Sequence, residues 1–81
     1  MNEIFSKILA ASYLYYICFE DTPWSDLEYD YYCHMMYSAW DELDHPHKGL
    51  ISHGDLRAGS LFQLRDYPKD VIEYANKWKE Q

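Results

Sequence analysis

The sequence predicts a small all-α protein in which two antiparallel helices form a hairpin and a third, C-terminal helix completes the domain. Apolar residues recur three and four positions apart in three stretches, which is the period of an amphipathic helix. Residues typical of helix starts precede these stretches. A chain of 81 residues is long enough for one domain, spanning 1–81, and its 19% aromatic content argues against disorder.

The first helix is expected to begin after Asn2, whose side chain can cap it, and to end near Glu20. Pro23 cannot continue a helix, so residues 21–24 form a turn. One broad apolar face is expected to face the core, and its members are Ile4, Phe5, Ile8, Leu9, Ser12, Tyr15, Tyr16 and Phe19.

The second helix is expected to begin after Ser25 and to run to about Leu43. Ser25 and Glu28 have the spacing of a capping box, in which each side chain bonds the backbone of the other residue. The predicted core stripe of this helix consists of Tyr29, Tyr32, Cys33, Met36, Trp40 and Leu43.

Residues 44–53 are predicted to form a loop, and residues 55–64 a short helical turn followed by an extended piece. The third helix is expected to have Pro68 at its first position, where the missing N–H costs nothing. Its apolar face consists of Val71, Ile72, Ala75 and Trp78. We expect this helix to cover the hairpin.

Charge is unevenly distributed along the chain. Fourteen acidic residues and seven basic ones give a net charge of −7, yet no Lys or Arg lies between Lys7 and Lys48. Residues 8–47, which we call the acidic segment, hold Glu20, Asp21, Asp26, Glu28, Asp30, Asp41, Glu42 and Asp44. Direct nucleic-acid binding is not expected, because affinity for phosphates comes from Lys and Arg. An acidic face can instead dock on a basic protein surface, although such charge also simply keeps a small protein soluble.

Membrane and redox signals are weak. No apolar run reaches the length of a membrane span, and the N-terminus lacks a signal-peptide cleavage site, so we expect a cytoplasmic protein. Cys18 and Cys33 are expected to be buried free thiols. The histidines, together with Cys33, match no zinc-site spacing, so no metal site is expected.

The turn between the first two helices is the most distinctive stretch for chemistry. Residues Tyr16, Asp26, Tyr29 and Asp30 are expected to gather there, with Asp26 and Asp30 on one helical face. Such a cluster can stack an aromatic ring and bond ribose hydroxyls. Aromatic stripes of this kind are, however, more often core than ligand platform.

Residues 16–30 read Tyr-Ile-Cys-Phe-Glu-Asp-Thr-Pro-Trp-Ser-Asp-Leu-Glu-Tyr-Asp, with an Asp-x-Pro turn followed by Asp-x-Glu-Tyr-Asp. This pattern resembles the N-terminal helical domain, called Ia, of bacterial NAD-dependent DNA ligases. His45-Pro46 and Leu56-Arg57-Ala58-Gly59 extend the resemblance toward residue 60. It implies a ligase Ia-like fold in which Tyr16, Asp26, Tyr29 and Asp30 contact the nicotinamide mononucleotide (NMN) half of NAD.

Ligation also needs a Lys-x-Asp-Gly nucleophile, and none occurs in these 81 residues. We therefore expect no enzymatic activity and no catalytic residue in this chain. The family's His corresponds here to Ile17, which cannot hydrogen-bond a ligand.

Three functional hypotheses remain. We favour a non-enzymatic interaction protein whose acidic residues dock on a basic surface of a host nucleic-acid-processing or defence protein. It would act there as an inhibitor or DNA mimic from a phage or mobile element. The alternative is an NAD- or NMN-binding module that complements a separate adenylation domain. In the third, the turn only specifies the hairpin. No cofactor is required by the first or third hypothesis, and self-association as a homodimer would bury surplus aromatic surface.

Overall fold

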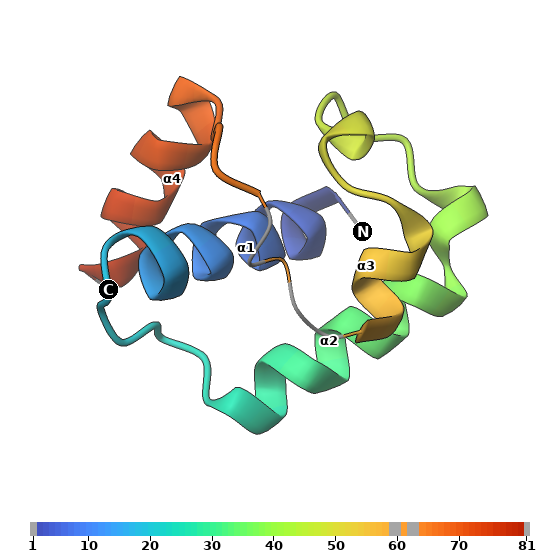
Figure 1. The fold of residues 1–81 in the computed structure, drawn as a ribbon, viewed down its shortest axis with the longest axis horizontal. Helices are drawn as coiled ribbons and strands as arrows, with labels where there is room; N and C mark the ends of the chain where they lie inside the picture. The colour runs from blue at the N-terminus through green and yellow to red at the C-terminus, as the bar shows by residue number, and fades with distance from the viewer. Residues whose placement is uncertain (1, 59–60, 62–63, 81) are drawn as a thin grey trace.

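The computed structural model describes residues 2–58, 61 and 64–80. These residues form four α-helices and contain no strand (Figure 1). The helices are α1 (Asn2–Ser12), α2 (Asp26–Ser38), α3 (His53–Ala58) and α4 (Lys69–Lys79). Helices α1 and α2 run in roughly opposite directions (Figure 1), and the all-α prediction is confirmed. No helix among the described residues is long and apolar enough to cross a membrane.

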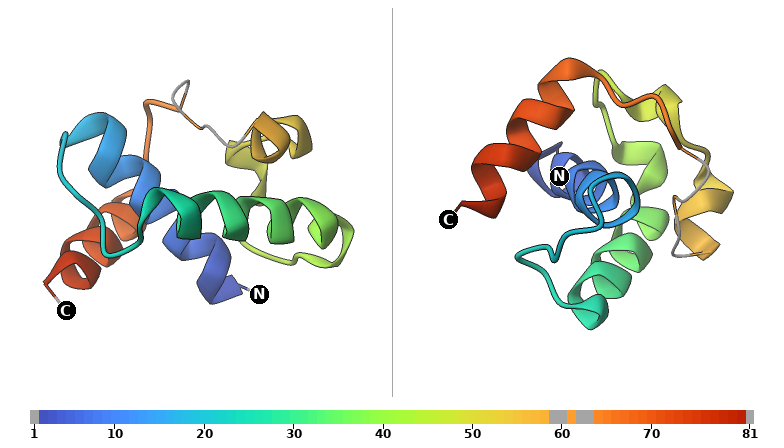
Figure 2. Two further views of the ribbon diagram at one scale, coloured as in Figure 1. Left: turned by 90° about the horizontal axis from the view of Figure 1, so that it is seen from below. Right: turned by 60° about the vertical axis from the view of Figure 1, so that its left-hand side comes forward.

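Helix α1 is the centre of the fold. Figure 2 shows it between α4 on one side and α2 with α3 on the other. Two core clusters form on its opposite sides. The cluster that includes α2 contains Phe5, Ile8, Leu9, Cys33 and Met36, and the cluster toward α4 contains Ala10, Ala11, Leu14, Ala75 and Trp78. Small side chains on the α4 side allow the two helices to approach closely, which explains why Ala10 and Ala11 are buried.

A π-helical turn, Tyr13–Ile17, follows α1 and ends three residues before the predicted end at Glu20. Of the predicted apolar face, Phe5, Ile8, Leu9 and Ser12 are buried and Ile4 and Tyr16 are half-buried, whereas the prediction is wrong for Tyr15 and Phe19. Tyr15 and Phe19 are exposed, whereas Leu14 is buried. A π turn is wider than an α turn, so residues after it no longer keep the 3.6-residue register that the prediction extended.

Helix α2 begins as predicted. Ser25 Oγ accepts a hydrogen bond from the Glu28 N–H at 3.2 Å, and Glu28 Oε1 accepts one from the Ser25 N–H at 3.1 Å. The α-helix ends at Ser38, earlier than predicted, and a 3₁₀ turn, Trp40–Glu42, carries the chain to the buried Leu43.

The segment after α2 contains more helix than expected. A 3₁₀ turn, Lys48–Leu50, lies inside the predicted loop, and α3 begins at His53. The His53 ring stacks on Tyr37 with centroids 3.9 Å apart, and its Nε2 lies 2.7 Å from the Tyr37 carbonyl oxygen, which ties α3 to α2. Residues 59–60 and 62–63 of the predicted extended piece, including Gly59, lie outside the described residues.

Helix α4 begins at Lys69, so Pro68 is its N-cap and not its first residue. Val71, Ala75 and Trp78 are buried as predicted. The helix packs mainly on α1, whereas α3 packs on α2, so no single helix covers the hairpin. His47 Nε2 and Asp70 Oδ2, 2.8 Å apart, join the loop after α2 to the first turn of α4.

Candidate functional site

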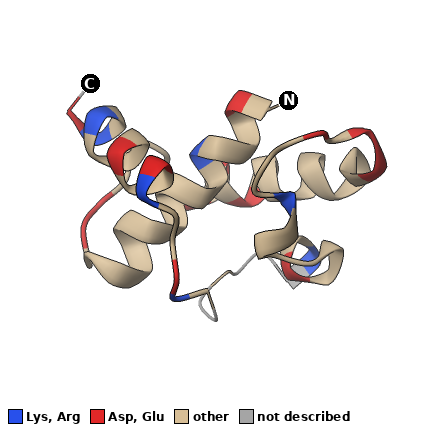
Figure 3. Ribbon diagram, turned by 90° about the horizontal axis from the view of Figure 1, so that it is seen from above, with Lys and Arg blue, Asp and Glu red and all other residues tan. Residues whose placement is uncertain are grey.

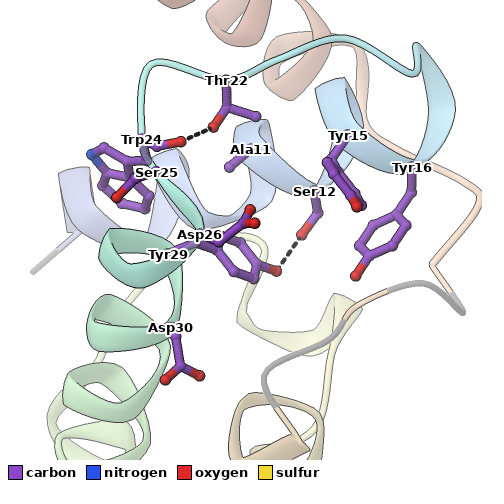
Figure 4. Close-up of a pocket in the computed structure, with 10 residues that line it drawn as sticks. All are labelled: Ala11, Ser12, Tyr15, Tyr16, Thr22, Trp24, Ser25, Asp26, Tyr29 and Asp30. Carbon is purple, nitrogen blue, oxygen red and sulfur yellow. Dashed lines mark hydrogen bonds between the residues drawn. The ribbon is translucent and has the colours of Figure 1, made fainter.

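A pocket of about 270 Å³ lies between the end of α1 and the start of α2 (Figure 4). All four residues that the sequence assigned to cofactor binding line it. The full lining is Ala11, Ser12, Tyr15, Tyr16, Thr22, Trp24, Ser25, Asp26, Tyr29 and Asp30. The chain thus brings two tyrosines of the π turn, the linker and the first turns of α2 around one hollow.

Tyr29 and Ser12 form the back of the pocket. The Tyr29 hydroxyl and Ser12 Oγ lie 2.7 Å apart, and Figure 4 shows this hydrogen bond joining α2 to α1. Ser12 is fully buried, and burial raises the pKa of the Tyr29 hydroxyl well above its usual value. Tyr29 is therefore a neutral group whose hydrogen-bonding capacity is already partly used within the fold.

Trp24 and Thr22 hold the linker side of the pocket. The Trp24 ring stacks on Tyr32 with centroids 4.4 Å apart and meets Trp78 of α4 edge-on at 5.2 Å. Thr22 donates its hydroxyl hydrogen to the Trp24 carbonyl at 2.7 Å. These contacts fix the linker against α2 and α4, so the pocket has one firmly packed wall.

The charged groups of the pocket are all acidic. Asp26 and Asp30 are exposed, and Asp30 Oδ1 lies 3.5 Å from His34 Nε2 along the helix. Figure 4 shows the Asp26 carboxylate close to Tyr29, whereas Asp30 points away toward the lower edge. Neither Lys nor Arg is among the described residues that line the pocket. Two carboxylates without a base favour a cation and disfavour a phosphate.

Sequence reasoning missed Tyr15, Trp24, Thr22 and Ser12 as pocket residues. Tyr15 and Ser12 followed the apolar stripe and were expected in the core, while Trp24 and Thr22 were expected only to form the turn. One signal in the sequence could have identified Trp24 as a pocket residue. It lies two residues before Asp26, in the turn that brings the predicted cluster together.

Four exposed apolar side chains lie close in sequence to residues that line the pocket. The four large hydrophobic residues most exposed among those described are Phe19 (88%), Leu27 (83%), Tyr31 (62%) and Tyr15 (56%). All four fall within the acidic segment, and within its part between residues 15 and 31. Tyr15 is part of the pocket lining, and Leu27 and Tyr31 each directly follow a pocket carboxylate in the sequence.

All eight acidic residues predicted to mediate protein interaction are exposed. Glu20 forms an ion pair with Lys79 at 2.9 Å, and Glu28 is used in the capping box. Figure 3 shows that the acids do not gather on one spot, because Glu20 and Asp21 follow the π turn while Asp41, Glu42 and Asp44 follow α2. Of the eight acids, Asp26 and Asp30 line the pocket.

The histidines of the loop take part in packing. His45 meets the Phe5 ring edge-on at 4.8 Å, and its Nε2 lies 2.8 Å from Ser6 Oγ. Within the described part of the chain, no group of three or more His, Cys, Asp or Glu residues could hold a metal ion. Cys33 is buried and Cys18 half-buried, and both are free thiols.

The chain matches no family model, and no curated protein or solved structure is significantly similar to it. The pocket and the exposed side chains around it are therefore the observations from which function is inferred.

Proposed function

We propose that this chain is a non-enzymatic interaction protein that docks on a basic surface of another protein. The contact surface consists of the exposed apolar residues Tyr15, Phe19, Leu27 and Tyr31 together with the neighbouring acids. The single observation that carries the proposal is that the most exposed large apolar side chains lie within the part of the chain that has no Lys or Arg.

Apolar side chains exposed to this degree have an unfavourable contact with water that a partner would remove. Each large apolar side chain is worth roughly 1.5–3 kcal/mol when fully buried. Interfaces combine such anchors, often aromatic, with a polar rim, and the acids around Phe19 and Leu27 supply the rim. The negative charges of these acids repel acidic proteins and favour approach to a basic surface.

A nucleic-acid-processing or defence protein has a basic surface of this kind, because it must neutralise phosphates. The chain would occupy that surface as an acidic mimic and inhibit the enzyme.

The experiment is affinity capture from a lysate with the tagged chain, in three matched forms at low and high salt. The forms are wild type, Phe19→Ser and Glu73→Gln, of which Glu73 is an exposed acid on α4. We expect wild type and Glu73→Gln to capture a protein with a basic surface, and Phe19→Ser to lose it. High salt should weaken this binding. Equal retention by Phe19→Ser, or retention insensitive to salt, contradicts the proposal.

A second candidate function is binding of a nicotinamide nucleotide, and one observation favours it. The four residues that the ligase resemblance assigns to the ligand all line one pocket. The pocket volume of about 270 Å³ lies below the roughly 300–1,000 Å³ of common small-molecule sites, so it suits one ring and not a whole dinucleotide. Titration with NAD and with NMN, followed by amide NMR shifts of Tyr16, Asp26 and Tyr29, tests this candidate.

A further inference from the structure

We infer that the pocket between α1 and α2 receives an arginine side chain of the partner. The inference rests on the proposed function and names the group that the partner contributes. Its geometric basis is the combination of Asp26 with the rings of Tyr15, Tyr16 and Trp24 in one open hollow.

A guanidinium group has two requirements that this hollow meets. Its planar faces stack on aromatic rings, and its N–H groups bond carboxylates in pairs. Aromatic side chains line the pocket on both the α1 side and the linker side, and Asp26 lies between them at the first position of α2 (Figure 4). An ammonium group is more strongly hydrated and cannot make the paired contact, so arginine is preferred to lysine.

The carboxylate of Asp26 is available for a partner. Among the described residues it has no ion pair, unlike Glu20, which Lys79 neutralises, and Asp30, which lies beside His34. Asp26 is not needed for the cap of α2, because Ser25 and Glu28 make both capping hydrogen bonds. A carboxylate without an ion pair, in a pocket lined by aromatic rings, suits a cation.

The size of the pocket agrees with a side chain. A hollow of about 270 Å³ is smaller than most small-molecule sites, and the exposed Tyr15 is part of its lining. A partner that covers Tyr15 brings its own side chains to the pocket. The hydrogen-bonded Tyr29 and Ser12 form the back of the pocket.

The test uses the intact chain and three blocked tripeptides of the form acetyl-Gly-X-Gly-amide, where X is arginine, lysine or citrulline. Citrulline has nearly the shape of arginine without its charge. We expect the arginine peptide to shift the backbone amides of Tyr15, Tyr16 and Asp26 saturably at millimolar concentration. The lysine peptide should bind several-fold more weakly, and the citrulline peptide should cause no saturable shift.

Asp26→Asn should weaken binding of the arginine peptide about tenfold, as expected for loss of a hydrogen bond to a charged group. Asp41→Asn makes the same change in the 3₁₀ turn after α2, outside the pocket lining, and should leave binding unaltered. Circular dichroism confirms that both variants are folded.

Two outcomes overturn the inference: no saturable shift with the arginine peptide, or equal binding of arginine and citrulline peptides. If NMN shifts these amides and the arginine peptide does not, the nucleotide candidate replaces it. If the arginine peptide does not bind, the docking surface is still tested independently by Phe19→Ser in the capture experiment. The two proposals can therefore fail separately.

Discussion

The hydroxyl groups of Tyr29 and Ser12, 2.7 Å apart, form a hydrogen bond that joins α2 to the central helix α1. Ser12 is fully buried on α1, and Tyr29 reaches it from the second turn of α2. The same bond closes the back of the pocket, so the stability of the hairpin and the shape of the candidate site depend on one contact. It is also the contact whose energetic value can be measured most directly.

Tyr29→Phe should lower the free energy of unfolding by about 1–2 kcal/mol, because the buried Ser12 hydroxyl loses its partner. Tyr31→Phe is a matched control on the same helix, because the Tyr31 side chain is exposed and its hydroxyl can bond water. Its removal should leave stability nearly unchanged. Urea denaturation of both variants, and of a double-mutant cycle with Ser12→Ala and Tyr29→Phe, measures the interaction energy of the pair, and an equal loss of stability in Tyr31→Phe would contradict the assignment.

The capping box of α2 gives a second stability prediction. Ser25→Ala removes the acceptor for the Glu28 N–H and should destabilise the protein by about 1 kcal/mol. Ser38→Ala, at the other end of α2, removes an exposed hydroxyl and should change stability little. Thermal unfolding of both variants provides the comparison. A similar melting temperature for the two would show that the cap contributes nothing.

The two thiols should differ in reactivity. Burial is the main cause that raises the pKa of the Cys33 thiol to about 11, so about one thiol in a thousand is ionised at pH 8. Cys18 is only half-buried. We expect iodoacetamide to modify Cys18 in the folded protein and Cys33 only after unfolding, as read by mass spectrometry of peptides. Equal labelling rates at the two sites in the native state would be inconsistent with the structure.

His45 should make stability depend on pH. Burial lowers the pKa of its imidazole below the usual value of about 6.5, with His47 adding to the effect and Asp70 opposing it. The unfolded chain therefore binds a proton that the folded chain resists, and stability falls as pH drops below about 6.5. His45→Gln should flatten the unfolding free energy between pH 7 and pH 5, measured by urea denaturation. An unchanged slope in His45→Gln would contradict this assignment.

The helices that local signals specify were predictable from the sequence. Ser25 and Glu28 are three residues apart, and their capping box requires only local backbone geometry, so the start of α2 followed directly. The apolar face of α4 was also predictable, because it depends only on the spacing of apolar residues along one helix. The π turn after Ser12 was not predictable, because it results from packing of Leu14 against Ala75 and Trp78 of α4. That distant contact exposes Tyr15 and Phe19, which the periodic pattern had assigned to the core.

The candidate site was predictable only in part. Asp26, Tyr29 and Asp30 lie within five residues on one helix, so their proximity followed from helical spacing. The contribution of Trp24 depends on its stacking with Tyr32 and its contact with Trp78, a residue far away in the chain. The exposure of Leu27 beside these acids likewise depends on which face of α2 the central helix covers.

Phe19 is the residue in which stability and the proposed function should oppose each other. It follows the π turn with φ of 56°, the left-handed conformation in which helix ends usually carry glycine, and its side chain is almost fully exposed. The Glu20 N–H donates to the Leu14 carbonyl at 2.9 Å, so the helix end requires this conformation. A bulky residue there costs about 1 kcal/mol relative to glycine.

Phe19→Gly should therefore raise the free energy of unfolding by up to about 1 kcal/mol, as measured by urea denaturation. The same variant should lose the partner that wild type captures, because the apolar anchor is gone. Phe19→Leu serves as the matched control, since it keeps an apolar side chain and the strain together and should retain the partner at wild-type stability. If Phe19→Gly gains stability and still captures the partner, Phe19 is not an anchor and the contact surface must lie elsewhere. A loss of stability would instead show that the exposed ring contributes to the fold.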